Sequence, residues 1–97
     1  MLVLITYDVS VITGAGQKRL RNIAKTCLDY GVRVQNSVFE CEVDPAKFAV
    51  LKDALLSIYD PGEDSLRFYF LGKHGRRRVE HFGTKFIPDP VRDPLIL

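Results

Sequence analysis

The sequence contains no tryptophan, one methionine and two cysteines, and it has no apolar run near the length of a membrane span. A transmembrane helix needs about 20 mostly apolar residues, and no basic segment followed by an apolar one marks a signal peptide. We therefore expect a cytoplasmic protein. Cys27 and Cys41 lack the spacing of metal ligands, so we expect them to be reduced, buried small side chains.

Signatures of phosphate-binding loops and of hydrolytic triads are missing as well. The segment Gly14-Ala15-Gly16 lacks the third glycine of a dinucleotide fingerprint, and the chain has no Gly-Lys-Ser/Thr. His74 and His81 have no serine, cysteine or carboxylate partner at a recognisable spacing. The pattern therefore supports neither a nucleotide cradle nor a serine or cysteine hydrolase.

The composition favours one packed domain. With 97 residues, 46% of them hydrophobic and 10% aromatic, the chain is long enough for two packed layers but too short for two domains. A chain of this size buries about 60 to 70% of the surface that its unfolded form exposes. A partner subunit would therefore add stability.

Residue patterns predict strands and helices in the order βαββαβ. Short β-rich runs alternate with two segments whose apolar residues repeat about every 3.6 positions. We interpret 32–35 and 38–43 as a tight hairpin, with one long bent strand as the alternative. The other expected elements are a strand at 2–9, a helix from Gln17 to Tyr30-Gly31, a helix from Asp44-Pro45 to Asp60, a strand at 65–71 and a short strand at 79–82.

This order predicts an α+β, ferredoxin-like fold with an additional C-terminal strand, as a single domain over 1–97. Right-handed crossovers place both helices on one face of the sheet and leave the other face uncovered. An uncovered face on a small domain favours pairing of two copies, so we expect a two-fold homodimer. Residues 83–97 carry three prolines and end in Leu95-Ile96-Leu97, which predicts an extended C-terminal strap.

Charges of opposite sign are segregated along the chain. Residues 17–33 hold five basic residues against one acid, whereas seven of the twelve acids lie between Glu40 and Asp64. This separation predicts a basic face for a polyanion such as a nucleic-acid backbone, and a solvated helix surface is the alternative for the residues at 18–25. The candidate backbone contacts are Lys18, Arg19, Arg21, Lys25 and the loop residues Arg76, Arg77 and Arg78.

Asp8 is the only acid in the first 28 residues, and it follows an apolar run that we expect to be a strand buried on both faces. A carboxylate at a strand end suits Mg²⁺ or Mn²⁺, because such ions take one or two protein carboxylates and keep several waters. One carboxylate binds Mg²⁺ poorly, but a two-fold axis near Asp8 would bring two together. The site would then exist only in the dimer, and an acid that caps the following loop is the alternative.

Arg33 is a second candidate, because a guanidinium at a strand end can hold a phosphate through two hydrogen bonds; a surface arginine is the alternative. Phe39 and Tyr7 are more often core residues than stacking platforms. Ser37 is either a turn residue or a side chain that reaches a site between subunits. The residues alone thus indicate a dimeric ferredoxin-like domain with a basic nucleic-acid surface and a symmetric pair of acids.

Several segments form a distinctive combination over essentially the whole chain. They are Leu-Ile-Thr-Tyr-Asp-Val at 4–9, the basic helix, Arg-Val-Gln-Asn-Ser-Val-Phe-Glu-Cys at 33–41, Leu-Arg-Phe-Tyr at 66–69 and the terminal Asp-Pro-Leu-Ile-Leu. Together they closely resemble the CRISPR-associated Cas2 family. The segment at 33–41 is the most distinctive, and with the tail it resembles the subtype I-C branch.

The resemblance implies a ferredoxin-like homodimer with two activities: a metal-dependent endonuclease on RNA or double-stranded DNA, and a scaffold that acts with the Cas1 integrase in spacer acquisition. A DNA-clamping scaffold without catalysis and a toxin-like ribonuclease are the alternatives. The resemblance also implies that Asp8 is the metal ligand and that Arg33 and Phe39 belong to the catalytic site. The longer first loop leaves open which helix positions correspond among Lys18, Arg19 and Arg21.

Overall fold

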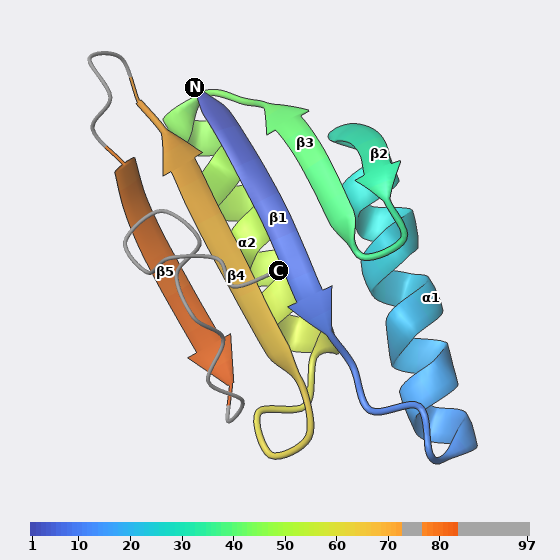
Figure 1. Cartoon of the computed structure of the whole chain (residues 1–97). Coiled ribbons are helices and arrows are strands. Elements are labelled where there is room, and N and C mark those ends of the chain that lie inside the picture. Colours follow the sequence, from blue (N-terminus) through green and yellow to red (C-terminus); the bar gives the residue numbers. More distant parts are fainter. Residues whose placement is uncertain (73–76, 84–97) are drawn as a thin grey trace, which may run out of the picture.

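The structure, a computed structural model, describes residues 1–72 and 77–83. This part of the chain forms five strands and two helices in the predicted order, with one strand added after the βαββαβ unit (Figure 1). The α+β, ferredoxin-like fold is therefore confirmed. The elements are β1 Leu2–Asp8, α1 Gly14–Leu28, β2 Gly31–Gln35, β3 Val38–Glu42, α2 Pro45–Ile58, β4 Ser65–Leu71 and β5 Arg77–Gly83.

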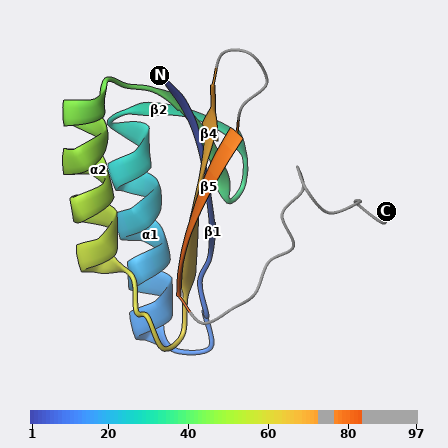
Figure 2. The same ribbon diagram turned by 90° about the vertical axis from the view of Figure 1, so that its left-hand side faces the viewer.

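One antiparallel sheet with the strand order β2-β3-β1-β4-β5 forms the first layer. Helices α1 and α2 lie side by side on one face of this sheet and form the second layer, as predicted (Figure 2). In the described part of the chain no helix covers the other face, which we call the open face; on β1 it carries Leu2, Leu4, Thr6 and Asp8. The core between the layers includes Ile5, Ile23, Phe39, Leu51 and Phe68, all 0% exposed.

Strand β1 lies in the middle of the sheet, paired with β3 on one side and β4 on the other. Val3, Ile5 and Tyr7 face the helices and are buried, whereas Leu4 and Thr6 on the open face are only partly buried. The expectation of a strand buried on both faces was therefore half right. The apolar run belongs to a central strand. Its buried and partly buried residues alternate, as expected for an antiparallel sheet with one covered face.

Helix α1 begins three residues before the predicted Gln17. Thr13 is its N-cap, because the Thr13 side chain accepts a hydrogen bond from the Gly16 N–H at 3.3 Å. A Cβ atom at Gly16 would collide with the Ser10 carbonyl oxygen, so glycine lets the preceding loop approach the helix closely. The helix ends at Leu28, which is 53% exposed.

Helix α2 and strand β4 follow their predictions closely. The Asp44 carboxylate accepts a hydrogen bond from the Lys47 N–H at 2.7 Å, and Pro45 opens the helix. β4 has the predicted bounds, and its residues from Ser65 to Phe70 are buried on both faces. A hairpin of β2 and β3, with a register shift between Arg33 and Gln35, confirms the preferred interpretation of this segment over one long bent strand.

Strand β5 is longer than the predicted 79–82, so the strand includes part of the predicted loop at 72–78. It is held to α2 by Lys52, whose Nζ donates a hydrogen bond to Glu80 Oε1 at 2.8 Å and lies 4.9 Å from the Phe82 ring centre. Residues 73–76 of that predicted loop and residues 84–97 of the strap lie outside the described residues.

Both cysteines are buried free thiols, as predicted. Burial raises the pKa of the Cys27 thiol to about 12, so the thiolate is disfavoured at neutral pH. Among the described residues, neither helix has the length and apolar character needed to cross a membrane.

Candidate cation and nucleic-acid site

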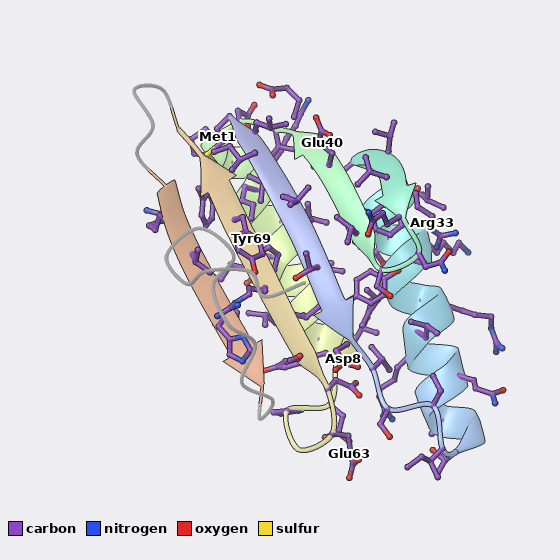
Figure 3. The ribbon with its side chains drawn as sticks, in the orientation of Figure 1. Met1, Asp8, Arg33, Glu40, Glu63 and Tyr69 are labelled. Atoms are coloured by element: carbon purple, nitrogen blue, oxygen red, sulfur yellow. The ribbon has the colours of Figure 1, made fainter. Side chains whose placement is uncertain are left out.

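Asp8 is the last residue of β1 and lies at one end of the sheet, near the α2–β4 turn that carries Glu63 (Figure 3). It is exposed, and the strand register places it opposite Ser65 of β4. Because side chains alternate along a strand, Asp8 belongs to the open face with Thr6. The structure therefore presents this carboxylate at the strand end, as predicted.

The ligand chemistry of this position suits a hard cation. In the described ranges, no group of three His, Cys, Asp or Glu side chains is arranged to hold a metal ion. A structural Zn²⁺ site uses four protein ligands, whereas Mg²⁺ binds through one or two carboxylates and keeps several waters. The carboxylate of Asp8 therefore fits Mg²⁺ or Mn²⁺, provided that water or a second copy of the chain supplies the other ligands.

Arg33 and Phe39 form a pair on the sheet face that carries the helices. The register places Arg33 of β2 opposite Phe39 of β3, and Phe39 opposite Ile5. Phe39 is 0% exposed, and the Arg33 guanidinium carbon lies 5.1 Å from its ring centre. Arg33 itself is exposed. The buried ring thus supports a guanidinium that remains accessible to solvent.

Tyr7 connects this pair to the end of β1. Its ring stacks on Phe39 with centres 6.0 Å apart and planes inclined by 21°. The Tyr7 hydroxyl donates to the Asn36 carbonyl at 3.3 Å, and the Tyr7 N–H donates to the Ser37 carbonyl at 3.2 Å. Burial raises the pKa of the Tyr7 hydroxyl, although a hydrogen bond with Arg33 opposes the shift. Tyr7 therefore fixes the β2–β3 turn against the strand that carries Asp8.

The three residues that the family resemblance placed in one catalytic site lie on two faces of a single chain. Asp8 lies on the open face at the end of β1, whereas Arg33 lies at the β2 edge on the side of the helices (Figure 3). Phe39 is in the core below Arg33. A single subunit therefore does not bring the proposed cation ligand and the arginine together.

The basic residues predicted to contact a nucleic-acid backbone lie on different elements. Lys18, Arg21 and Lys25 are exposed on α1. Arg78 is exposed on β5, 3.6 Å from Glu80 and 4.2 Å from the Phe70 ring centre. The side chain of Arg77 and the whole of Arg76 lie outside what the structure describes.

Arg19 differs from its neighbours, because it is engaged inside the molecule. Its Nε donates a hydrogen bond to Asp64 Oδ2 at 2.7 Å, and its Nη2 donates to Asp64 Oδ1 at 3.3 Å. The Asp64 side chain is 0% exposed. The structure thus places Arg19 in an ion pair between α1 and the residue that precedes β4.

Asp64 was not singled out from the sequence as a site residue. Burial alone would raise the pKa of its carboxyl, but hydrogen bonds from Arg19 and from the N–H groups of Asp60 and Ser10 outweigh burial and lower the pKa. Its signal in the sequence was the same as that of Asp8: a carboxylate at the boundary of an apolar strand.

The fold and these residues define a small ferredoxin-like domain with a carboxylate at the end of its first strand and a basic first helix. The family described as CRISPR associated protein Cas2 matches residues 1–79. The chain belongs to the Cas2 family, as the sequence resemblance indicated.

Named relatives that match nearly all of this chain support the assignment to this family. The chain is 61% identical over 97 residues to the CRISPR-associated endoribonuclease Cas2 of Nitratidesulfovibrio vulgaris, with 100% of this chain and 94% of the relative covered. It is 54% identical over 96 residues to the CRISPR-associated endonuclease Cas2 of Halalkalibacterium halodurans, with 99% of each covered. The crystal structure of Streptococcus pyogenes Cas2 at pH 6.5 superposes with a TM-score of 0.71 and 61% identity, covering 76% of this chain and 89% of that one.

Proposed function

We propose that this protein is a metal-dependent endonuclease of a CRISPR system that cleaves phosphodiester bonds in RNA or double-stranded DNA and acts as a two-fold homodimer. Support comes from the relatives, which are named endoribonuclease in one case and endonuclease in another. The segment at 33–41 and the terminal residues further favour a subtype I-C system.

The exposed carboxylate of Asp8 on the open face is the observation that carries this proposal. One carboxylate per chain is a weak Mg²⁺ ligand, but pairing of two copies through the open face brings two such carboxylates toward a common axis. Two carboxylates that approach each other repel when both are ionised. A cation shared between them relieves this repulsion, so the cation and the dimer stabilise each other.

In this proposal the residues of the site have different roles. Asp8 holds the cation, which when bound supplies an activated water and neutralises charge on the phosphodiester. Arg33 contacts the nucleic-acid backbone away from the cleaved bond, because it lies on the other face of its own subunit. Phe39 acts as a positioning residue that holds the Arg33 guanidinium over its ring. The exposed residues Lys18, Arg21 and Lys25 add contacts to phosphates.

The function is tested with Asp8→Asn, which preserves the size of the side chain and removes its charge. We expect wild-type protein with Mg²⁺ or Mn²⁺ to cleave RNA or duplex DNA, and Asp8→Asn to lose cleavage while its duplex affinity stays within about twofold. The two ions should also raise the melting temperature of the wild type and not that of Asp8→Asn. Equal cleavage, or equal melting shifts, in the two proteins would contradict the proposal.

A scaffold function is the second candidate, and the basic residues of α1 favour it independently of Asp8. Their exposed side chains bind phosphates without reading base sequence. We propose that the dimer binds duplex DNA in this way during spacer acquisition with the Cas1 integrase, and that the strap at 83–97 adds a strand to a neighbouring sheet edge. If this is the only function, Asp8→Asn will support spacer integration at the wild-type rate and wild-type protein will show no cleavage.

A further inference from the structure

Asp64 is a buried acid with four hydrogen-bond donors from three separate parts of the chain. Arg19 of α1 donates two bonds, at 2.7 and 3.3 Å. The Ser10 N–H donates to Asp64 Oδ1 at 3.1 Å, and the Asp60 N–H donates to Oδ2 at 2.9 Å. The loop after β1, helix α1 and the turn before β4 therefore meet at one carboxylate.

The position of this junction relates it directly to Asp8. The last rung of the β1–β4 ladder pairs Asp8 with Ser65, and Asp64 is the residue immediately before Ser65. Ser10, whose N–H the Asp64 carboxylate binds, is two residues after Asp8. Beyond this last rung, the hydrogen bond from the Ser10 N–H to Asp64 connects the two segments again.

Ser10 is held from its other side as well. Its carbonyl oxygen lies where a Cβ atom of residue 16 would stand, so the close approach requires Gly16 at the first turn of α1. Arg19 lies one turn further along this helix and holds the helix to Asp64. The Ser10 backbone is thus held between Asp64 on one side and helix α1 on the other.

We propose that Arg19 and Asp64 form a bracket that positions the Asp8 carboxylate for cation binding, and that Arg19 does not contact nucleic acid. The inference rests on the proposed cation site at Asp8. A fully buried carboxylate is costly unless its partners stay in place. The bracket therefore resists movement of Ser10 and fixes the orientation of the end of β1. Both residues act on the cation through Asp8 and are positioning residues.

The first experiment compares Asp64→Asn with Asp53→Asn, an acid on the exposed side of α2. Amide hydrogen exchange of Ser10 reports the bracket directly and needs neither cation nor substrate. We expect at least tenfold faster exchange at Ser10 in Asp64→Asn and no change in Asp53→Asn. In Asp64→Asn we also expect a rise of about tenfold in the Mn²⁺ concentration that gives half of the maximal increase in melting temperature. Loss of a residue that orients a metal ligand typically weakens metal binding by at least this factor. Wild-type values for both quantities in folded Asp64→Asn would overturn the inference.

The second experiment uses Arg19, which keeps the test valid if Asp64→Asn does not fold. An arginine that neutralises one phosphate contributes about 0.9 to the slope of log affinity against log salt. We expect Arg19→Gln and Arg19→Lys to keep the wild-type slope for duplex DNA and to raise the half-maximal Mn²⁺ concentration, because neither residue reproduces the two hydrogen bonds. Arg21→Gln, on the exposed part of the same helix, should show the opposite pattern.

A lower salt slope in Arg19→Gln that Arg19→Lys restores, with unchanged Mn²⁺ dependence in both, would show that Arg19 is a phosphate contact and would overturn the inference. Failure of the proposed function looks different. In that case the wild type shows no melting shift with Mn²⁺, while Ser10 exchange still distinguishes Asp64→Asn from Asp53→Asn.

Discussion

Replacing Phe39 by leucine separates its role as a platform for Arg33 from its role as a core residue. Leucine remains apolar and buried but lacks the ring that stacks on Tyr7 and lies under the guanidinium at 5.1 Å. An aromatic pair contributes about 0.5–1.5 kcal/mol beyond burial, and an exposed cation–π contact contributes about 0.5–1 kcal/mol. We therefore expect Phe39→Leu to lower the free energy of unfolding by about 1–2.5 kcal/mol.

The same change should also weaken the contact of Arg33 with nucleic acid. Without the ring, the guanidinium loses its fixed position, so one phosphate contact is weakened. We expect the slope of log affinity against log salt for duplex DNA to fall by up to about 0.9. Phe39→Ala should instead cost about 3–5 kcal/mol, a large share of the roughly 5–15 kcal/mol typical of a domain. Its loss of activity would therefore reflect unfolding.

Phe48→Leu is the matched control. Phe48 is 7% exposed and packs edge-on against Phe68 and Phe70, with ring centres 5.4 and 4.9 Å away. It should lose a similar amount of stability in urea titration at one fixed protein concentration and keep the wild-type salt slope. If Phe39→Leu and Phe48→Leu have the same salt slope as the wild type, Phe39 does not position a phosphate contact and is a core residue only.

Three further changes test other parts of the structure. If Arg21 contacts one phosphate as proposed, Arg21→Gln should lower the slope of log affinity against log salt for duplex DNA by about 0.9; an unchanged slope in filter binding would remove Arg21 from the interface. The folded-state pKa of Asp64 lies below its ordinary value of 3.8, so its contribution to stability is complete above about pH 4 and is lost as the pH falls through the lowered pKa. Urea titrations between about pH 2 and 6 should show this loss in the wild type and a smaller one in Asp64→Asn. Cys27, with a pKa of about 12, should react with iodoacetamide at pH 8 only when the chain opens; alkylation of the native protein at the rate of a free thiol would contradict its burial.

The fold was predictable where local patterns and tertiary packing agree. The β-rich run at 65–71 and the Asp44-Pro45 helix start predicted β4 and the beginning of α2 because both signals are local. The start of α1 was missed because glycines normally indicate a loop. Here Gly16 is required by the close approach of Ser10, a contact that only the folded chain reveals.

The length of β5 was missed for a related reason. Arg77 and Arg78 belong to a basic, glycine-flanked run that is typical of a loop, yet both lie in the strand. Pairing with β4, in which Phe70 is opposite Arg78 and Leu71 is opposite Arg77, overrides the local preference. Pairing partners of this kind cannot be read from the composition of one segment.

The candidate site was predictable only in part. The position of Asp8 at a strand end follows from the apolar run before it, and the structure agrees. The role of Arg19 was not predictable, because its partner Asp64 is 45 positions away. A basic helix residue and a strand-boundary acid give no sign in the sequence that they meet. The predicted dimer and the shared cation remain predictions.

The central claim is that two copies of the chain share one cation through their Asp8 carboxylates. Calorimetric titration with Mn²⁺ tests it most directly. The account predicts one Mn²⁺ bound per two wild-type chains and no binding of similar affinity to Asp8→Asn. One ion per chain, or binding that Asp8→Asn leaves unchanged, would contradict it.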